Sequence, residues 1–323
     1  MINAKTLPLV WIFLGAAYGL AMRGIFGYLS HSQAFPVVSV VSFAFTLGTP
    51  FVIGAIVIYG LRNANPSVIQ MIFVPWIAIA LALTGSAVTL LEGAVCIILA
   101  APVLLVGSSI GGLIMGLSLR FSNKSSAPLN SILALPLVLM VVEPSVPQQP
   151  RLMEDRVCVE VSATPHRIWS EILNARNIRK EELPFSFTHL IGVPRPVEGV
   201  NMMTPDGEMR FSKWERGVTF SARVTQRFDD RSITWLYNFT PDSFPDGSLD
   251  EHVKIGGQYF DLYDTTFNLT PESENLTRLE IISHYKVTTD VNFYAVPVAR
   301  FVAKDFMSTI VHLYKSRSER SAG

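Results

Sequence analysis

The chain has 323 residues, with 26 basic and 26 acidic side chains and no net formal charge at pH 7. This balance excludes the basic surface that nucleic-acid-binding proteins use against phosphates, and the length suggests about two domains. Residues 1–150 contain few charged side chains. A stretch this long and this poor in charge would not be soluble as a globular domain, so the sequence predicts a membrane half followed by a soluble half. Its only charged residues are Lys5, Arg23, Arg62, Glu92, Arg120, Lys124 and Glu143. We place the multi-pass membrane domain at 1–146, a proline-rich linker at 147–152 and the soluble domain at 153–323.

Five apolar runs lie in the membrane half, at residues 7–28, 36–60, 68–91, 93–119 and 125–142. Helices are expected because backbone amides in lipid must be satisfied within the segment. The third and fourth runs would span about 78 Å as one helix, far beyond a bilayer. We therefore predict a turn near 84–93 and a bundle of about five transmembrane helices.

Basic residues predict the orientation of this bundle. Lys5, Arg62, Arg120 and Lys124 fall on the amino-terminal side in a five-pass arrangement. The positive-inside rule then predicts a cytoplasmic amino terminus in a bacterial inner or plasma membrane, with the soluble domain periplasmic or extracellular. A signal peptide over the first thirty residues is the competing interpretation, and the four further apolar runs count against it.

Two charges and several glycines stand out within the apolar runs. Arg23 and Glu92 lie near membrane depth, and we expect both to extend toward the interface from helix ends. The absence of a charged row along a helix argues against a transporter or a channel.

Small residues at four-residue spacing predict close helix packing, either within one bundle or in a homo-oligomer. The pairs are Gly15/Gly19, Gly107/Gly111 and Gly112/Gly116.

The soluble half begins with a strand and a short helix and ends with a long helix. Val157, Val159 and Val161 alternate over 156–163, and Thr164-Pro165 then suits the cap and first turn of a helix reaching about Asn174. The last apolar pattern, over 298–313, has the helical period. Between them we predict strands at 200–203, 208–215, 218–228, 232–239, 258–269 and 277–289.

This order of elements carries a resemblance. The segments V-C-V-E-V-S-A-T-P-H-R-I-W-S-E-I-L-N, R-S-I-T-W-L-Y, L-T-R-L-E-I-I-S-H-Y-K-V and A-R-F-V-A-K-D-F resemble the START-like, helix-grip superfamily, also called SRPBCC or polyketide cyclase/dehydrase and lipid transport. It covers about Val157 to Ser318. The resemblance implies an α+β fold, with a curved antiparallel sheet wrapped on a long carboxyl-terminal helix and a cavity for an apolar or amphipathic ligand. The membrane half resembles uncharacterised bacterial membrane proteins that carry such a domain.

Strand alternation proposes residues for that cavity, although ordinary core packing would give the same pattern. Ile233, Trp235 and Tyr237 share one strand face, Tyr259, Tyr263 and Phe267 a second, and Leu279, Ile281 and Tyr285 a third. Tyrosines put a polar tip on an apolar wall, as ligand sites often do. The predicted lining residues are Trp235, Tyr237, Tyr259, Tyr263, Tyr285, Phe301, Val302 and Phe306.

Catalytic and metal-binding signals are weak. None of His166, His189, His252, His284 and His312 has a second ligand at metal-site spacing, so we predict no metal and no cofactor. Asp261, Asp264 and Lys213 are conceivable acid/base groups, although surface charge explains them better. We therefore expect a membrane-anchored domain that binds a hydrophobic or lipid-like molecule at the membrane face, with membrane lipids as partners. The alternatives are a cyclase- or dehydratase-like enzyme of the same superfamily and a membrane sensor or assembly module.

Overall fold

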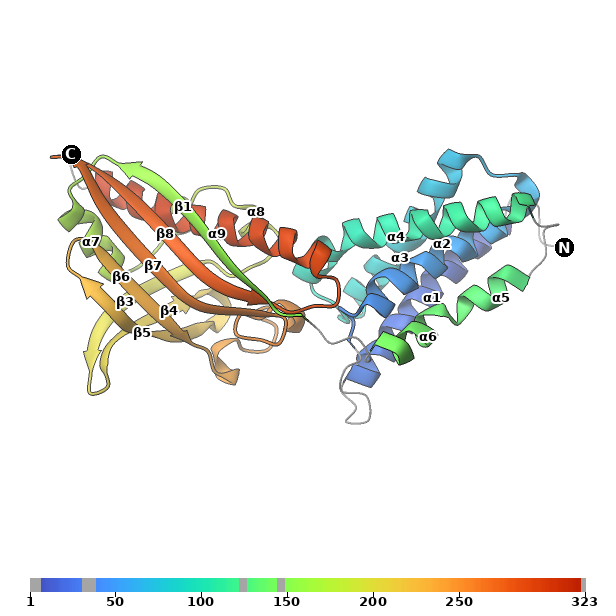
Figure 1. Cartoon of the computed structure of the whole chain (residues 1–323), viewed down its shortest axis with the longest axis horizontal. Helices are drawn as coiled ribbons and strands as arrows, with labels where there is room; N and C mark the ends of the chain where they lie inside the picture. Colours follow the sequence, from blue (N-terminus) through green and yellow to red (C-terminus); the bar gives the residue numbers. More distant parts are fainter. Residues whose placement is uncertain (1–6, 31–38, 122–126, 144–148, 321–323) are drawn as a thin grey trace. The chain divides into compact units, whose positions relative to one another are not determined.

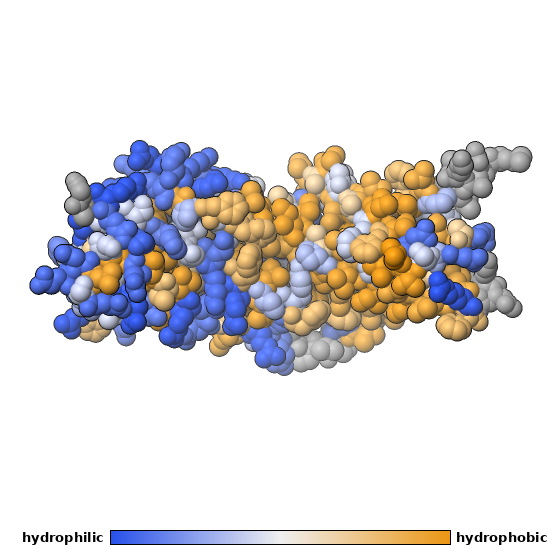
Figure 2. Space-filling view, turned by 90° about the horizontal axis from the view of Figure 1, so that it is seen from above, coloured by the Kyte–Doolittle hydropathy of each residue, from blue (hydrophilic) through white to orange (hydrophobic). Residues whose placement is uncertain are grey.

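The computed structural model describes residues 7–30, 39–121, 127–143 and 149–320. The chain forms two compact units: unit 1 is residues 1–149 with 289–291, and unit 2 is 150–288 with 292–323. Lys5, Lys124 and residues 147–148 of the predicted linker lie outside the described residues. Figure 2 shows apolar residues over most of the visible surface of the helical unit and polar residues over most of unit 2.

All five apolar runs of unit 1 are helical. The helices are α1 (Leu7–Ser30), α2 (Thr49–Gly60) after a π-helical turn (Ala44–Gly48), α3 (Val68–Val88), α4 (Ala94–Phe121), α5 (Ala127–Leu133) and α6 (Leu135–Val142). The predicted turn between the third and fourth runs is confirmed at residues 89–93. Among the described residues, three helices, over Pro8–Ser30, Val68–Val88 and Ala94–Phe121, are long and apolar enough to cross a membrane. The fifth run is divided at Ala134, two residues before Pro136 in the first turn of α6, because proline lacks the N–H that a continuous helix needs.

Glycines let the helices of unit 1 approach at backbone distance. A Cβ on Gly54 of α2 would lie 1.9 Å from the Ser108 carbonyl oxygen of α4, and one on Gly111 would lie 1.9 Å from the Phe51 carbonyl oxygen. Only the absence of a side chain allows these contacts. The predicted glycine pairs all lie against neighbouring helices of the same unit.

Arg23 does not lie at a helix end as expected, whereas Glu92 does, in the turn between α3 and α4. Helix α1 continues to Ser30, so Arg23 lies within it. Its Nε is 2.6 Å from Glu92 Oε1, its Nη2 donates to the Leu91 carbonyl at 2.6 Å, and the two charged side chains are only 12% and 14% exposed. Buried charge is tolerated when it is paired and hydrogen-bonded. The pair ties α1 to the turn between α3 and α4.

Unit 2 is an eight-stranded antiparallel sheet with three helices (Figure 1). The strand order is β1-β8-β7-β6-β5-β4-β3-β2, and each neighbouring pair is antiparallel. Helix α9 packs along β1 and β8 on the inner face of the sheet. This is the predicted helix-grip arrangement. The elements are β1 (Arg151–Val161), α7 (Pro165–Leu173), β2 (Asn174–Ala175), α8 (Phe187–Leu190), β3 (Pro196–Thr204), β4 (Gly207–Trp214), β5 (Thr219–Phe228), β6 (Ser232–Asn238), β7 (Phe260–Ser273), β8 (Leu276–Val287) and α9 (Asn292–Arg320).

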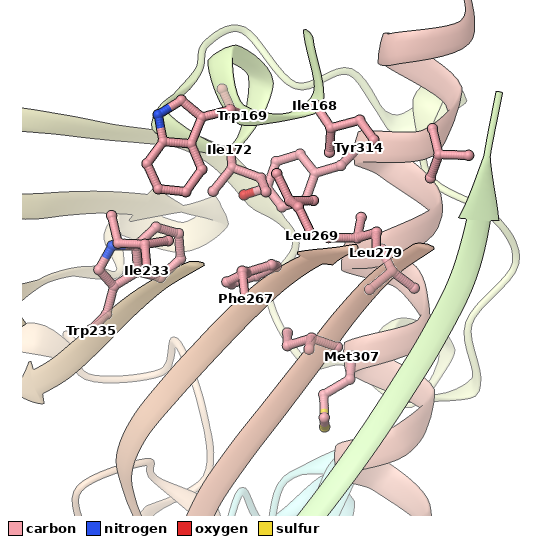
Figure 3. Packing of buried hydrophobic residues seen from close by; sticks show 14 of the residues in the cluster. Ile168, Trp169, Ile172, Ile233, Trp235, Phe267, Leu269, Leu279, Met307 and Tyr314 are labelled. Atoms are coloured by element: carbon pink, nitrogen blue, oxygen red, sulfur yellow. The ribbon is translucent and has the colours of Figure 1, made fainter. Parts of the chain in front are cut away.

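The core of unit 2 lies between the sheet, α7 and α9 (Figure 3). Ile281 of β8 pairs with Val157 of β1 and Phe267 of β7, so the alternating apolar residues of three strands point to the same side. Met307 and Val311 of α9 close this layer. Burial of such side chains contributes about 1.5–3 kcal/mol each, which explains why the strand pattern in the sequence predicts the inner face well.

One bulge changes the predicted alternation. The register of β7 against β8 shifts between Leu262 and Asp264, so Tyr263 does not share a face with Phe267 as strict alternation predicts. The Lys286 ammonium lies 5.6 Å from the centroid of the Tyr263 ring. Because Lys286 alternates out of phase with the buried Tyr285, the ring of Tyr263 lies on the outer side of the sheet.

Substitution of Gly54 tests the helix contacts. Gly54→Ala should lower the free energy of unfolding by about 1–3 kcal/mol, the usual cost of overpacking, because the methyl group would meet the backbone of α4. Gly24→Ala is the matched control, since nothing lies within 4 Å of a Cβ there. The thermal midpoint of the detergent-solubilised chain measures both, and equal midpoints for the two variants would contradict this packing.

Candidate functional site

Aromatic side chains cover the inner face of unit 2 beyond the core. Trp214 of β4 lies 5.1 Å from Phe220 of β5 and 5.0 Å from Phe306 of α9, measured between ring centroids. Phe220 also contacts Tyr237 and Phe239, at 5.9 and 5.3 Å. We call these five residues the aromatic cluster. It presents a broad apolar surface with one phenol hydroxyl, an environment that suits an apolar or amphipathic molecule.

Asp305 positions the short helix α8 beside this cluster. Its carboxylate accepts hydrogen bonds from the Ser186 hydroxyl at 2.5 Å and from the backbone N–H groups of Thr188 and Phe187 at 2.8 and 3.3 Å. Burial raises the pKa of Asp305, but these hydrogen bonds outweigh it and the pKa is lowered. A carboxylate from α9 thus caps α8 and fixes the side chains that follow.

His189 of α8 is held inside by this cap. It is 6% exposed, and its ring centroid lies 5.6 Å from that of Phe306. Its Nδ1 lies 3.1 Å from the Val193 carbonyl oxygen, which can only accept, so Nδ1 carries the proton and Nε2 is a bare acceptor. Nε2 has no hydrogen-bond partner among the described residues. Burial is the main reason that the pKa of His189 is lowered, so the ring is neutral at pH 7.

Trp235 supplies a second buried polar atom without a partner. The side chain is 4% exposed, and its Nε1 has no hydrogen-bond acceptor among the described residues. The ring lies between the Arg210 guanidinium, 4.3 Å from the centroid, and the Phe267 ring at 5.0 Å. A buried donor without an acceptor costs about 1–3 kcal/mol, so such an atom needs an explanation.

Arg210 is a buried cation held by neutral groups. It is 5% exposed and donates to the Ile172 carbonyl, to Asn201 Oδ1 at 3.2 Å and to the Tyr314 hydroxyl at 3.1 Å. Within the part of the chain that the structure describes, it forms no ion pair with a carboxylate. These bonds join α7, β3 and α9, and we assign Arg210 a structural role in closing this end of the grip.

Three hydroxyl groups cross the inner face on adjacent strands. Tyr237 of β6 interacts with Thr265 of β7, whose hydroxyl lies 2.9 Å from that of Ser283 on β8. Burial raises the pKa of Tyr237 to about 12, so its hydroxyl stays neutral. This row gives the otherwise apolar interior a line of uncharged hydrogen-bonding groups.

Asp155 anchors α9 to the sheet at another point. It is 5% exposed, accepts a 2.6 Å hydrogen bond from the Tyr285 hydroxyl, and lies 3.2 Å from Arg300 Nε and 3.4 Å from Lys304 Nζ. Burial and this carboxylate together raise the pKa of Tyr285. Asp155 therefore joins β1 and β8 to two cationic residues of α9.

The predicted lining residues occupy several places. Tyr237 and Phe306 belong to the aromatic cluster, Trp235 lies in the adjoining core, and Tyr285 is buried against Asp155. The other four lie elsewhere. On α9, Phe301 is 54% exposed, and Val302 is partly buried, with its carbonyl oxygen accepting a hydrogen bond from the Thr188 hydroxyl. Tyr263 lies beside Lys286, and Tyr259 lies beside His252.

His189, Trp214 and Phe220 were missed by the sequence analysis. Alternation in β4 places Trp214 on the same face as the buried Arg210. The strand pattern alone could therefore have identified Trp214 as an inward residue. The burial of His189 was not, because it depends on Asp305, which is 116 residues away in sequence and caps α8.

The conceivable acid/base groups lie outside this interior. Asp264 Oδ1 is 2.7 Å from His284 Nδ1, and Asp261 lies 3.6 Å from Lys286. The hydrogen bond that His284 donates to Asp264 is the main reason that the pKa of His284 is raised. Lys213 is exposed and lines a groove of about 370 Å³ that Phe220 of the aromatic cluster also lines. Across the described residues, no group of three or more His, Cys, Asp or Glu could hold a metal ion.

Comparisons with known proteins give structural likenesses only. No family model and no curated protein matches the chain. It is similar to a START superfamily protein from Mycobacterium smegmatis, with 14% identity, a TM-score of 0.35 and coverage of 52% of this chain and 98% of that chain. It is also similar to the Zhui aromatase/cyclase from Streptomyces sp. R1128, with 10% identity, a TM-score of 0.33 and coverage of 53% of this chain and 94% of that chain. Norcoclaurine synthase from Thalictrum flavum is similar with 9% identity, a TM-score of 0.32 and coverage of 55% of this chain and 99% of that chain.

Removal of the Asp155 charge tests the anchor of α9. Asp155→Asn should lower the free energy of unfolding of unit 2 by about 1.5–3 kcal/mol, because hydrogen bonds to a charged group are lost in a buried place. Asp230→Asn is the control, since Asp230 pairs with a largely exposed His166. Unfolding followed by near-ultraviolet circular dichroism measures the difference, and similar stabilities would refute the anchor.

The two histidines should affect stability in opposite directions with pH. Because the pKa of His189 is lowered in the folded state, its contribution to folding stability is lost as pH falls below the unfolded pKa of about 6.5. Because the pKa of His284 is raised, its contribution to folding stability is fully present below about pH 6.5 and is lost as pH rises through the folded pKa. His189→Gln should therefore reduce the acid destabilisation, and His284→Gln should increase it. Thermal midpoints between about pH 5 and 8 test this, and parallel profiles would contradict it.

Proposed function

We propose that this chain is an integral membrane protein whose unit 2 binds a hydrophobic or lipid-like molecule between the inner face of the sheet and α9. The observation that carries the proposal is the pair of buried, unpartnered polar atoms, His189 Nε2 and Trp235 Nε1, on a face rich in aromatic rings. A core made only for packing has no use for such atoms. A ligand that carries polar groups on an apolar body would satisfy such atoms.

The chemistry of the interior favours an uncharged polar group on this ligand. His189 Nε2 accepts, Trp235 Nε1 donates, and the Tyr237 hydroxyl does both. The buried cation Arg210 is already hydrogen-bonded to three neutral acceptors. A hydroxyl group, which can both donate and accept, is the best match to these atoms, with the aromatic cluster around the apolar part.

Three long apolar helices support the membrane attachment. We propose that they hold unit 2 at a bacterial inner or plasma membrane, with the amino terminus cytoplasmic and unit 2 on the periplasmic or extracellular side. The proposed ligand would then meet unit 2 from the lipid phase, where hydrophobic molecules are concentrated.

The enzyme alternative rests on His189. A neutral, buried imidazole with a free Nε2 lone pair has the properties of a general base, so a cyclase- or dehydratase-like reaction on the bound molecule is the second candidate function. Loss of turnover with retained binding in His189→Gln would favour the enzyme, and unchanged chemistry would remove it.

Photolabelling of the full chain tests the binding proposal. The protein in lipid nanodiscs is exposed to a long-chain alcohol carrying a diazirine, and labelled peptides are identified by mass spectrometry. We expect labels on peptides of β6 and α9 as well as on the membrane helices. Labels confined to the membrane helices would overturn the proposal.

A matched pair of tryptophan variants sharpens this test. Trp235→Phe removes the unpartnered N–H and should lower labelling of β6 and α9 about two- to tenfold. This range corresponds to the loss of a hydrogen bond to the ligand that contributes about 0.5–1.5 kcal/mol. Trp169→Phe is the control, because Trp169 is equally buried and its nitrogen is not among the unpartnered atoms. Equal losses in both variants would mean that packing, rather than the N–H group, determines labelling.

A further inference from the structure

Apolar side chains gather on the outward side of α8 and the first half of α9. Phe185, just before α8, is 83% exposed, and Leu190 at its end is 66% exposed. The Phe187 ring lies 5.4 Å from the Phe301 ring of α9, which is 54% exposed. These residues are therefore neighbours, although they come from segments more than one hundred residues apart.

The same surface continues along α9. Phe293 is 66% exposed, and Pro297 is exposed one turn later. Positions 293, 297 and 301 are four residues apart, so they lie on one side of the helix. We call the apolar patch the set Phe185, Phe187, Leu190, Phe293, Pro297 and Phe301.

Cationic residues border the apolar patch. Arg300 and Lys304 lie on α9 next to Phe301, and their side chains are about half exposed, at 49% and 50%. Both share one buried carboxylate, that of Asp155 at 3.2 and 3.4 Å, and the neighbouring carboxylate on α9, Asp305, caps α8. Exposed aromatic rings with basic neighbours are the combination found where proteins meet lipid headgroups.

A short connection joins unit 1 to unit 2. Helix α6 ends at Val142 and β1 begins at Arg151, so only residues 143–150 connect them. This connection can extend over about 30 Å at most. A lipid surface is therefore always within reach of unit 2 if unit 1 is inserted in a bilayer.

We propose that the apolar patch docks on the surface of the bilayer that holds unit 1, with its aromatic rings among the lipid headgroups. The proposal rests on the membrane attachment proposed above and adds the surface through which unit 2 contacts lipid. Docking there would also place α8, which carries His189, next to the lipid phase that supplies the proposed ligand.

Site-directed nitroxide labels in the full chain test this docking. Cys96→Ser and Cys158→Ser remove the two native thiols, and Leu190→Cys then carries the label. Met203→Cys is the matched control, because Met203 is also apolar and exposed, at 82%, but lies on β3 away from the patch. Both proteins are reconstituted in vesicles of phosphatidylethanolamine and phosphatidylglycerol, and collisions with oxygen and with a water-soluble nickel chelate are measured.

We expect the ratio of oxygen to nickel collisions to be several-fold higher at position 190 than at position 203. A label at Phe185→Cys should behave like the one at 190, and it keeps the test decisive if one variant folds poorly. Equal, water-like ratios would overturn the docking, and so would a label at 190 shielded from both reagents, which would indicate a protein contact. Retention of the chain in vesicles after an alkaline wash is scored separately, so failure of membrane attachment is distinguished from failure of docking.

Discussion

Carboxylates that pair with or cap α9 and its neighbours hold unit 2 together. Asp155 joins β1 and β8 to Arg300 and Lys304, and Asp305 reaches from α9 to the backbone of α8. Near the other end, Glu182 lies 2.7 Å from Arg317. These polar anchors fix the helix that contributes Phe306 to the aromatic cluster.

The two units use apolar residues in opposite ways. Large apolar side chains of unit 1 such as Phe13, Ile69 and Val106 are more than half exposed, while its interior contains glycines that bring backbones together. In unit 2 the apolar residues of the strands are mostly inside, and the exposed exceptions gather in part at the apolar patch. The proposed membrane attachment accounts for the first distribution, and the proposed docking accounts for the exposed exceptions in the second.

The sequence carried much of the fold because its strongest signals are periodic. Apolar runs of bilayer length predicted the helices of unit 1, and alternating or helical stripes predicted β1, β8 and α9. The sequence could not show the β7 bulge that turns Tyr263 outward, since one extra residue in a strand leaves no distinct composition. Nor could it show that Arg23 pairs with Glu92, or that Asp305 caps α8 and buries His189, because these contacts join residues far apart along the chain.

The central claim is that a hydrophobic molecule occupies the inner face of unit 2. Electron cryomicroscopy of the full chain, purified in nanodiscs formed directly from its own membrane, tests this most directly. The account predicts elongated density against the aromatic cluster, with a polar end within hydrogen-bonding distance of Trp235 Nε1 or His189 Nε2. A well-ordered map in which the side chains of the cluster meet one another, with no density among them, would contradict it.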